Sequence, residues 1–346
     1  MKQRAVLTLL RQAERLRGVL ALPRLGTAAS MRRALILAML VFLAGCARSP
    51  VPPLRVATHP WPGYESLHLA QSLGYFDASQ VRLVELANAS QTYEALSHGT
   101  ADAAVQTLDE ILALMQHGAD LRVVLVMDVS DGADVVLARP GIATLHDLRG
   151  KRVGVENTTT GAVLFDAMLT AADLSAGDLQ LVPLSMNEHV AAYGRGQVDA
   201  LVTYDPPRSI LLRGGAHVLF DSSRIPGRIV DVLVVRADAL DDHRQQIAAL
   251  VAAHFKALHY LRQRPQDAAR RLSPFLGVTA DQVPSQFVGM NLPDLGENRS
   301  LLAGTAPGLT LRAAELGELM LRHKLLESKV ATDRLADPAF LPEEAK

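Results

Sequence analysis

Short apolar runs and amphipathic segments alternate along the chain, and they do so twice in the same order. The apolar runs are rich in β-formers and short enough for strands, whereas the segments between them repeat apolar residues with helical spacing. The first series comprises the predicted strands 54–59 (LRVATH) and 81–86 (VRLVEL) and the predicted helices 63–76 and 90–99. The second comprises the strands 151–156 (KRVGVE) and 179–184 (LQLVPL) and the helices 158–174 and 187–196. Each series closes with a third apolar run, so the order β-α-β-α-β occurs twice.

The third strand of each series opens with a similar sequence. GTADAAVQTLDE at 99–110 and GQVDALVTYDPP at 196–207 share a Gly, an Asp-Ala pair, an apolar run and a Thr two residues before an Asp, and they lie about 97 residues apart. Because alternating strands and helices favour parallel sheets covered by helices on both faces, we predict two similar α/β lobes. The Asp of each Asp-Ala pair is expected to have a structural role at the start of its strand, as a cap or a helix partner.

The remaining apolar patterns indicate how the two lobes join. A strongly apolar strand at 121–127 precedes the second series, and the run VDVLVVR at 230–236 is expected to cross back to the first lobe. Beyond it the chain is mainly helical, with 243–265 the clearest amphipathic helix. We expect a leader, a tether, the first part of lobe 1, an inserted lobe 2 and the completion of lobe 1 with C-terminal helices, with bounds 1–46, 47–53, 54–140, 141–235 and 236–346, and crossings near 137–144 and 231–236.

The N-terminal region predicts export and lipidation. In MRRALILAMLVFLAGC, at 31–46, two arginines precede ten apolar residues and a small-small-Cys ending. This is typical of a secretory signal peptide, and its apolar run is too short to span a membrane comfortably. The ending resembles a bacterial lipobox, so Cys46 is predicted to be lipidated and to become the mature N-terminus; the alternative is a plain signal peptide with an incidental Cys. Residues 1–30 are either an extended basic region or lie before the true start at Met31.

Composition narrows the function classes. The chain has 346 residues, 49% hydrophobic and 21% charged, with a formal net charge of -1, which fits two globular lobes and offers no strong field for nucleic acid. Its single Cys permits neither an internal disulfide nor a Cys-based metal site. We found no GxSxG, HExxH, P-loop or GxGxxG motif, and predict no catalytic residue, metal or cofactor.

Several features together resemble a known family. The lipobox, the two lobes, GYF after the first helix, LRGKRVGV before the second lobe and an acid-Pro pair after DALVT resemble ABC-transporter solute-binding proteins over roughly 54–305. The closest group is the nitrate/sulfonate/taurine and thiamine-precursor (SsuA/THI5-like) class. That family often has aromatic-Glu-Pro where this chain has Tyr204, Asp205 and Pro206, so the acid here is one methylene shorter.

The resemblance implies a type II periplasmic-binding-protein fold, with two doubly wound lobes, a hinge and an interlobe ligand cleft. It also implies a monomer that delivers a small polar ligand to an ABC permease and its ATPase. The protein would lie on the periplasmic side of the cell envelope and contact a membrane only through its lipid anchor. Two alternatives are an enzyme of related fold, such as a pyrimidine synthase, and a sensor lipoprotein without transport. The identity of the membrane and the existence of a cognate permease stay open.

The loops after the strands carry the candidate site, because ligands of open parallel sheets bind outside the carboxyl ends of the strands. These loops hold many acids, whereas their bases are confined to Arg224 and Arg228. An amine-bearing heterocycle, such as a thiamine-precursor pyrimidine, is therefore favoured over an anion. The predicted ligand-binding residues are Trp61, Tyr64, Glu65, Asp109, Glu110, Asp128, Thr158, Thr159, Thr160, Tyr204 and Asp205.

Within this set we assign different roles. Asp109 and Asp205 occupy echoing positions and are predicted to hold the ligand from both sides, while Trp61 and Tyr64 supply an aromatic face. The alternative for Trp61 is packing under its loop. The threonines of TTTG open a helix, where they either provide a polar edge or simply cap it. If that helix N-terminus binds the ligand, a sulfonate, nitrate or similar small anion is the alternative ligand.

Overall fold

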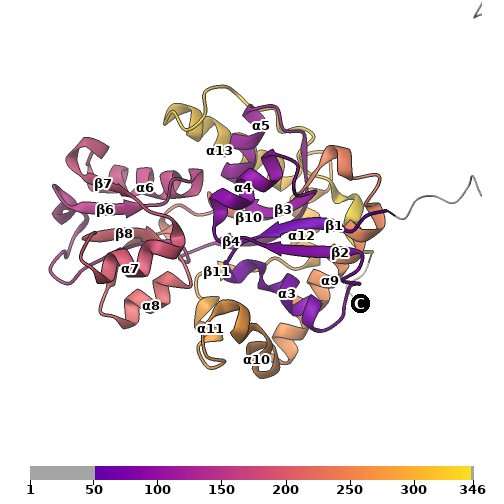
Figure 1. The fold of residues 1–346 in the computed structure, drawn as a ribbon. Helices are drawn as coiled ribbons and strands as arrows, with labels where there is room; N and C mark the ends of the chain where they lie inside the picture. The colour runs from indigo at the N-terminus through magenta and orange to yellow at the C-terminus, as the bar shows by residue number, and fades with distance from the viewer. Residues whose placement is uncertain (1–50, 344–346) are drawn as a thin grey trace, which may run out of the picture. The chain divides into compact units, whose positions relative to one another are not determined.

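The computed structural model describes residues 51–343; Cys46, the leader and most of the tether lie outside the described residues. Two sheets organise the described chain (Figure 1). The first has the order β2-β1-β3-β10-β4-β11 and consists of β1 (Leu54–Thr58), β2 (Val81–Glu85), β3 (Ala103–Thr107), β4 (Leu121–Ser130), β10 (Val230–Arg236) and β11 (Met290–Asn291). The second has the order β7-β6-β8-β5-β9 and consists of β5 (Val135–Ala138), β6 (Arg152–Val155), β7 (Gln180–Pro183), β8 (Ala200–Thr203) and β9 (His217–Asp221).

The two sheets share one plan. In each, a central strand pairs in parallel with two neighbours, β1 with β2 and β3, and β6 with β7 and β8. In each, one antiparallel strand is inserted next to the third strand: β10 between β3 and β4, and β5 between β8 and β9. The predicted pair of α/β lobes is confirmed, and we call the first sheet with its helices lobe 1 and the second lobe 2.

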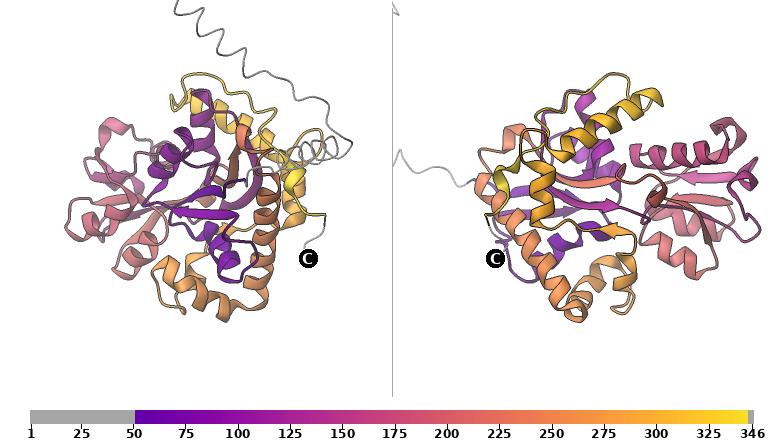
Figure 2. Two further views of the ribbon diagram at one scale, coloured as in Figure 1. Left: turned by 45° about the vertical axis from the view of Figure 1, so that its right-hand side comes forward. Right: turned by 180° about the vertical axis from the view of Figure 1, so that it is seen from behind.

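Helices cover both faces of each sheet, as Figure 2 shows from two further sides. In lobe 1, one apolar cluster includes residues of α4, α5 and α13, and another includes residues of α3, α9 and α10. In lobe 2, residues of α6 pack on one face and residues of α7 and α8 on the other. The helices are α3 (Glu65–Ser72), α4 (Ala89–Ser97), α5 (Leu108–Gln116), α6 (Thr159–Ala172), α7 (His189–Gly194), α8 (Pro207–Arg213), α9 (Arg244–Gln263), α10 (Pro265–Leu276), α11 (Val283–Gln286), α12 (Leu295–Leu302) and α13 (Gly308–Arg322). None of the described helices is both long and apolar enough to cross a membrane.

The repeated Asp of each Asp-Ala pair ties two strands together. Asp102 accepts a hydrogen bond from the backbone N–H of Arg55 (2.9 Å) and pairs with its guanidinium (2.6 Å). Asp199 makes the same contacts with Arg152, at 2.9 and 2.7 Å. Each carboxylate therefore fixes the first strand of its lobe to the start of the third, which is the structural role that the repeat predicted.

The chain crosses between the sheets earlier than the sequence suggested. Because β5 lies in the second sheet, the first crossing is 131–134, and the expected boundary after residue 140 is corrected. Because β10 lies wholly in the first sheet, the second crossing is 222–229, and the expected boundary after residue 235 is corrected as well. Both strands are short buried apolar runs, and such a run has the same local pattern whichever sheet it joins.

The two crossings are joined by one buried serine. Ser222 donates its backbone N–H to the carbonyl of Asp134 (2.9 Å), and its hydroxyl lies 2.7 Å from the hydroxyl of Ser130. The same hydroxyl accepts a hydrogen bond from the N–H of Gly132 at 2.7 Å. Ser222 is fully buried, so these bonds are shielded from water and hold the crossing segments side by side.

Candidate functional site

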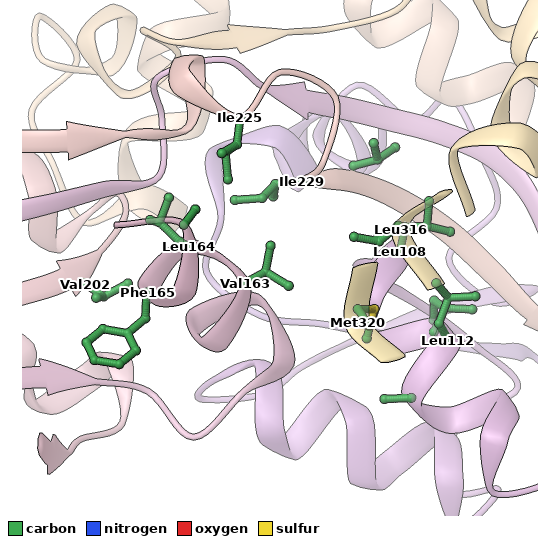
Figure 3. Close-up of a cluster of buried hydrophobic side chains, with 14 of the residues drawn as sticks. Leu108, Leu112, Val163, Leu164, Phe165, Val202, Ile225, Ile229, Leu316 and Met320 are labelled. Atoms are coloured by element: carbon green, nitrogen blue, oxygen red, sulfur yellow. The ribbon is translucent and has the colours of Figure 1, made fainter. Parts of the chain in front are cut away.

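A cavity of about 40 Å³ lies between the two lobes. It is lined by residues of both lobes and of both crossings. The lining residues are His59, Trp61, Tyr64, Ala89, Gln106, Thr107, Asp134, Glu156, Thr158, Thr160, Gly161, Leu164, Val202, Thr203, Tyr204, Ile229 and Asp231. Apolar side chains of α5, α6, α13 and the second crossing pack into one continuous cluster, shown in Figure 3. The lobes are therefore in contact, and the space between them is small.

Equivalent positions of the two lobes line this cavity. Twelve of the seventeen lining residues form six pairs whose members are 97 residues apart. The pairs are His59 and Glu156, Trp61 and Thr158, Tyr64 and Gly161, Gln106 and Thr203, Thr107 and Tyr204, and Asp134 and Asp231. The last pair lies at the start of the inserted strands: Asp134 comes directly before β5, and Asp231 is the second residue of β10. Their neighbours hold equivalent registers, since Val135 aligns with Thr203 in β8 as Val232 aligns with Gln106 in β3. The 97-residue repeat that predicted two lobes therefore also indicates which residues of each lobe line the cavity.

Carboxylates hold the aromatic wall of lobe 1. The indole Nε1 of Trp61 donates to Oδ2 of Asp128 (2.9 Å), and the hydroxyl of Tyr64 donates to Oδ1 of Asp231. The ring of Trp61 also meets the ring of Tyr204 from lobe 2, with centroids 5.5 Å apart in an edge-on arrangement. Gly63 allows the backbone to pass this close, since a Cβ at that position would lie 1.8 Å from Oδ2 of Asp128. The wall is therefore fixed by hydrogen bonds before any ligand arrives.

The N-terminus of α6 is satisfied by the chain's own acceptors. Glu110 of lobe 1 accepts a hydrogen bond from the N–H of Thr159 at 2.7 Å. Thr158 is the N-cap: its hydroxyl accepts from Gly161 N–H (3.1 Å) and its carbonyl from Ala162 N–H (3.1 Å). The capping alternative for this threonine is thus observed, and the helix end that could hold an anion already contacts a carboxyl group.

A second group of hydroxyls joins the lobes beside this helix end. The hydroxyl of Thr160 donates to Oδ2 of Asp109 (2.9 Å) and lies 2.7 Å from the hydroxyl of Thr107. Asp109 therefore bonds lobe 2 across the cleft and does not itself line the cavity.

A family comparison agrees with this architecture. The model of the NMT1-like family matches residues 47–275, which is more than half of the chain. The chain belongs to the NMT1-like family.

Two relatives show which kinds of protein this NMT1-like chain is similar to. A protein of Escherichia coli (strain K12) named for aliphatic sulfonate binding is 32% identical over 152 residues, covering 43% of this chain and 47% of the relative. A Haemophilus influenzae protein named for thiamine biosynthesis is 24% identical over 215 residues, covering 60% of this chain and 68% of the relative. The first match thus spans about half of the relative's length. Together they confirm the resemblance to the sulfonate and thiamine-precursor class.

Solved structures confirm the fold. The periplasmic aliphatic sulphonate binding protein SsuA from Escherichia coli superposes with a TM-score of 0.69 at 22% identity, covering 84% of this chain and 93% of that one. The desulfurization enzyme DSZB superposes with a TM-score of 0.60 at 20% identity, covering 83% and 97%. The predicted periplasmic-binding-protein fold is therefore established, and the same fold also carries an enzyme.

Five of the predicted site residues line the cavity of the NMT1-like protein, namely Trp61, Tyr64, Thr158, Thr160 and Tyr204. The structure places Glu65, Asp109, Glu110, Asp128, Thr159 and Asp205 outside the lining. Glu110 and Thr159 bond each other across the lobes, and Asp128 positions Trp61.

The structure places neither Asp109 nor Asp205 in the lining, and their role in holding a ligand from both sides stays a prediction. Asp205 accepts from Ser209 N–H (2.9 Å) and pairs with Arg208 (3.1 Å) at the start of α8. The two acids are 96 residues apart, one fewer than the repeat, so they do not occupy equivalent positions. Glu65 also lies outside the lining and pairs with His68 (3.1 Å) on the buried side of α3.

Sequence reasoning did not assign twelve of the seventeen lining residues to the site, among them Gln106, Glu156 and Asp231. The signal was present in the 97-residue spacing, since each of these three residues is the repeat partner of another lining residue. It also missed Arg208, whose side chain is only 12% exposed and adds a base close to the acids.

Burial makes the acids around the cavity hard to ionise. Desolvation raises the pKa of Asp128 and of Asp134 to about 7, and burial with the nearby Asp109 raises the pKa of Glu110 to about 8. The pKa of Asp231 is raised well above its usual value by burial and by Asp128, its direct neighbour across β10 and β4. Burial lowers the pKa of His59 to about 3, so this ring is neutral at pH 7.

The unmet hydrogen bonds of the cavity are all on oxygen atoms of amide and carboxyl groups. Among the described lining residues, the buried polar atoms without a partner are Gln106 Oε1, Asp134 Oδ2, Glu156 Oε1 and Asp231 Oδ2. These four side chains belong to residues no more than 6% exposed. Buried polar groups are normally paired, so a molecule that supplies donors would complete the site. The described residues hold no group of three or more His, Cys, Asp or Glu arranged for a metal ion.

Proposed function

We propose that this protein is the extracytoplasmic solute-binding component of an ABC importer. The observation that carries the proposal is the interlobe cavity, which two similar lobes line from six pairs of equivalent positions. A ligand bound there would contact both lobes and stabilise their closed arrangement, as hinge closure requires. The sulfonate-binding relative and the fold likeness to SsuA support this class. The protein then binds its ligand without converting it, and its partners are an ABC permease and ATPase.

The ligand is a small polar molecule that offers N–H donors, as an amine-bearing heterocycle such as a thiamine-precursor pyrimidine does. Unpartnered acceptors at Gln106, Asp134 and Asp231 support this class. Aromatic rings of Trp61 and Tyr204 on opposite lobes provide faces for a flat ring.

A small oxyanion such as a sulfonate is the second candidate, favoured by the 32% identical relative. Two features of the cleft weigh against it: Glu110 occupies the N-terminus of α6, and no Lys or Arg is among the described lining residues. An anion would have to displace Glu110 to reach the N–H of Thr159. Removing that carboxyl in Glu110→Ala should therefore raise affinity for propanesulfonate about tenfold or more. As a control, Glu94→Ala at an exposed position of α4 should leave this affinity unchanged.

We also propose that the protein is anchored on the periplasmic side of the envelope by lipid at Cys46, after cleavage of the leader. Residues 47–53 then act as the tether. The Cys46→Ala variant should remain unprocessed or become soluble, as fractionation of cells would show. A processed variant that stays with membranes as the wild type does would exclude lipid anchoring at this residue.

The decisive experiment for solute binding is a thermal-shift screen of the purified mature chain. The panel holds propanesulfonate, taurine, nitrate, 4-aminopyrimidine and butylamine. A true ligand at about 100 times its dissociation constant should add about 2.7 kcal/mol to the free energy of unfolding, and chromatography should recover it unchanged. Saturable binding without product supports the proposal; steady product formation would favour an enzyme, to which the fold of DSZB is a precedent.

A further inference from the structure

Asp134 and Asp231 are equivalent residues that enter the cavity from the two crossings. Asp134 ends the first crossing before β5, and Asp231 follows the second crossing as the second residue of β10. Both line the cavity, and they are 5% and 2% exposed. Resting on the proposed function, we infer that these two aspartates form a subsite for a positively charged, N–H-bearing group of the ligand.

Each side chain of this subsite has one oxygen atom without a partner. Asp231 accepts from Tyr64 through Oδ1, which leaves Oδ2 without a partner, and Asp134 also has an unpartnered Oδ2. Two neighbours repeat the arrangement: Glu156 accepts from Tyr204 (3.0 Å) and leaves Oε1 free, and Gln106 donates to Ala89 O (3.2 Å) and leaves its Oε1 free. The acceptors are thus fixed in advance, which limits the ordering cost of binding.

The charges around the subsite select the sign of the ligand. The base near Asp134 is Arg208, and Arg208 is already paired with Asp205 at 3.1 Å. Asp231 has Asp128 opposite it on β4, and no described lining residue is Lys or Arg. An anion placed here would share a desolvated site with carboxyl groups, which is unfavourable. A cation turns the same groups into charge-assisted acceptors, which form the stronger class of hydrogen bond.

The geometry also limits the kind of cation. The acceptors come from several side chains on both lobes, so one point donor would leave some of them unpaired. A planar group with several N–H bonds, such as an amidinium or a protonated aminoheterocycle, can satisfy two or more acceptors at once. Its ring would lie against the aromatic side chains of Trp61, Tyr64 and Tyr204, which also line the cavity.

A matched series of probes tests this directly. Benzamidinium, benzamide and benzoate have nearly the same shape but are a cation, a neutral amide and an anion. Titration calorimetry at pH 8 on the mature chain should give at least tenfold tighter binding of benzamidinium than of benzamide, and no detectable benzoate binding. Because ionised aspartates bind the cation, its affinity should fall as the pH decreases below about 7, at which Asp134 gains its proton.

Isosteric variants identify the residues. Asp134→Asn and Asp231→Asn remove an ionisable carboxyl group without changing shape, so both should fold, and each should weaken benzamidinium binding at least tenfold. Asp131→Asn, on an exposed residue of the same crossing, is the control and should bind as the wild type does. The pH dependence should also flatten in Asp134→Asn, which a purely structural role would not produce.

Several results would overturn the subsite. These are benzoate or benzamide binding as tightly as benzamidinium, full affinity in both Asn variants, or no benzamidinium binding at about 10 mM, a concentration at which even millimolar affinity stabilises a protein. If benzamidinium fails while a sulfonate from the earlier panel binds saturably, the solute-binding function stands and only the cation subsite is wrong. If no molecule of either series binds, the proposed function fails as well.

Discussion

The two lobes differ most where they are most nearly equivalent. At two pairs of repeat positions, lobe 1 has the large aromatics Trp61 and Tyr64, whereas lobe 2 has Thr158 and Gly161. The aromatic wall of lobe 1 is held by carboxylates from its own sheet, while the helix end in lobe 2 is held by Glu110 from the opposite lobe. The shared backbone plan therefore decides where a side chain meets the cavity, and the side chain decides whether it gives bulk or polar contacts.

Away from the cavity, one pair of repeat positions makes the same contacts in both lobes. Asp102 with Arg55, and Asp199 with Arg152, make the same backbone and guanidinium contacts within 0.1 Å of each other. This identical pair lies outside the cavity and holds the scaffold, whereas Asp134 and Asp231 are identical and line the cavity. Position relative to the cavity, and not identity alone, therefore separates the two kinds of repeat pair.

The largest expected effect on stability comes from adding a methyl group at Gly63, a position that is crowded in lobe 1 but not at its equivalent in lobe 2. Gly63 is the repeat partner of Thr160, so a β-carbon is accepted in lobe 2 but would lie 1.8 Å from Asp128 in lobe 1. Gly63→Ala should lower the free energy of unfolding by about 3 kcal/mol, because the Trp61–Asp128 contact must move. Urea unfolding followed by Trp61 fluorescence would measure it.

The control for that variant is Gly194→Ala. Nothing lies within 4 Å of a β-carbon at this last residue of α7, so the change should be neutral or raise stability by about 0.5 kcal/mol. Equal losses in the two variants would show that Gly63 is not sterically required.

A smaller effect should follow from pH, since the acids of the interlobe site have pKa values raised by burial. For Asp128 and Asp134 the folded pKa, about 7, lies above the unfolded value. The native state therefore holds extra protons between about pH 5 and 7, and stability should fall as pH rises by about 1.4 kcal/mol per pH unit for each extra proton. Asp109, Asp205 and Arg208 face Asp134. None of these three residues is changed in the variants Asp134→Asn and Asp131→Asn.

Urea midpoints measured across this range would test the slope. Asp134→Asn should make it shallower, and Asp131→Asn should leave it unchanged. A stability that is constant or that increases from pH 5 to 7 in the ligand-free protein would contradict the assignment of raised pKa values to these buried acids.

The sequence was most informative where a pattern was repeated and least informative where the chain changed sheets. The apolar runs predicted eight of the eleven described strands, because burial of a strand needs an apolar run, whereas β5, β9 and β11 were not predicted. Asp109 and Asp205 misled because they match by motif but differ by one residue from the 97-residue spacing, and one residue on a helix turns the side chain by about 100°.

Asp231 shows what the patterns left out. It lies inside the apolar run VDVLVVR, which reads as an ordinary buried strand. A charged residue within a buried strand is itself a sign of a partner or a ligand, and its distance of 97 residues from Asp134 would have linked the two acids. The contacts of Asp231 with Tyr64 and Asp128 depend on strands 100 or more residues apart in the chain, which local patterns do not encode.

The smallest expected difference concerns the two strand-fixing aspartates. Asp102→Ala and Asp199→Ala remove the same set of hydrogen bonds in the two lobes, from side chains of similar exposure (15% and 22%). We expect the two variants to lower the urea midpoint by equal amounts, since their surroundings are equivalent. A marked inequality would show that one lobe unfolds separately from the other.

Ser222 has a mechanical consequence for how the protein could open. Two linking segments that are hydrogen-bonded to each other can bend together but resist sliding and twisting. Ser222 makes such bonds between the segments Ser130–Asp134 and Ser222–Ile229. We therefore expect the lobes to rotate about a single axis, without twisting relative to each other. If the protein binds a ligand as proposed, opening along this one direction would bring the two halves of the site back into the same alignment each time the lobes close.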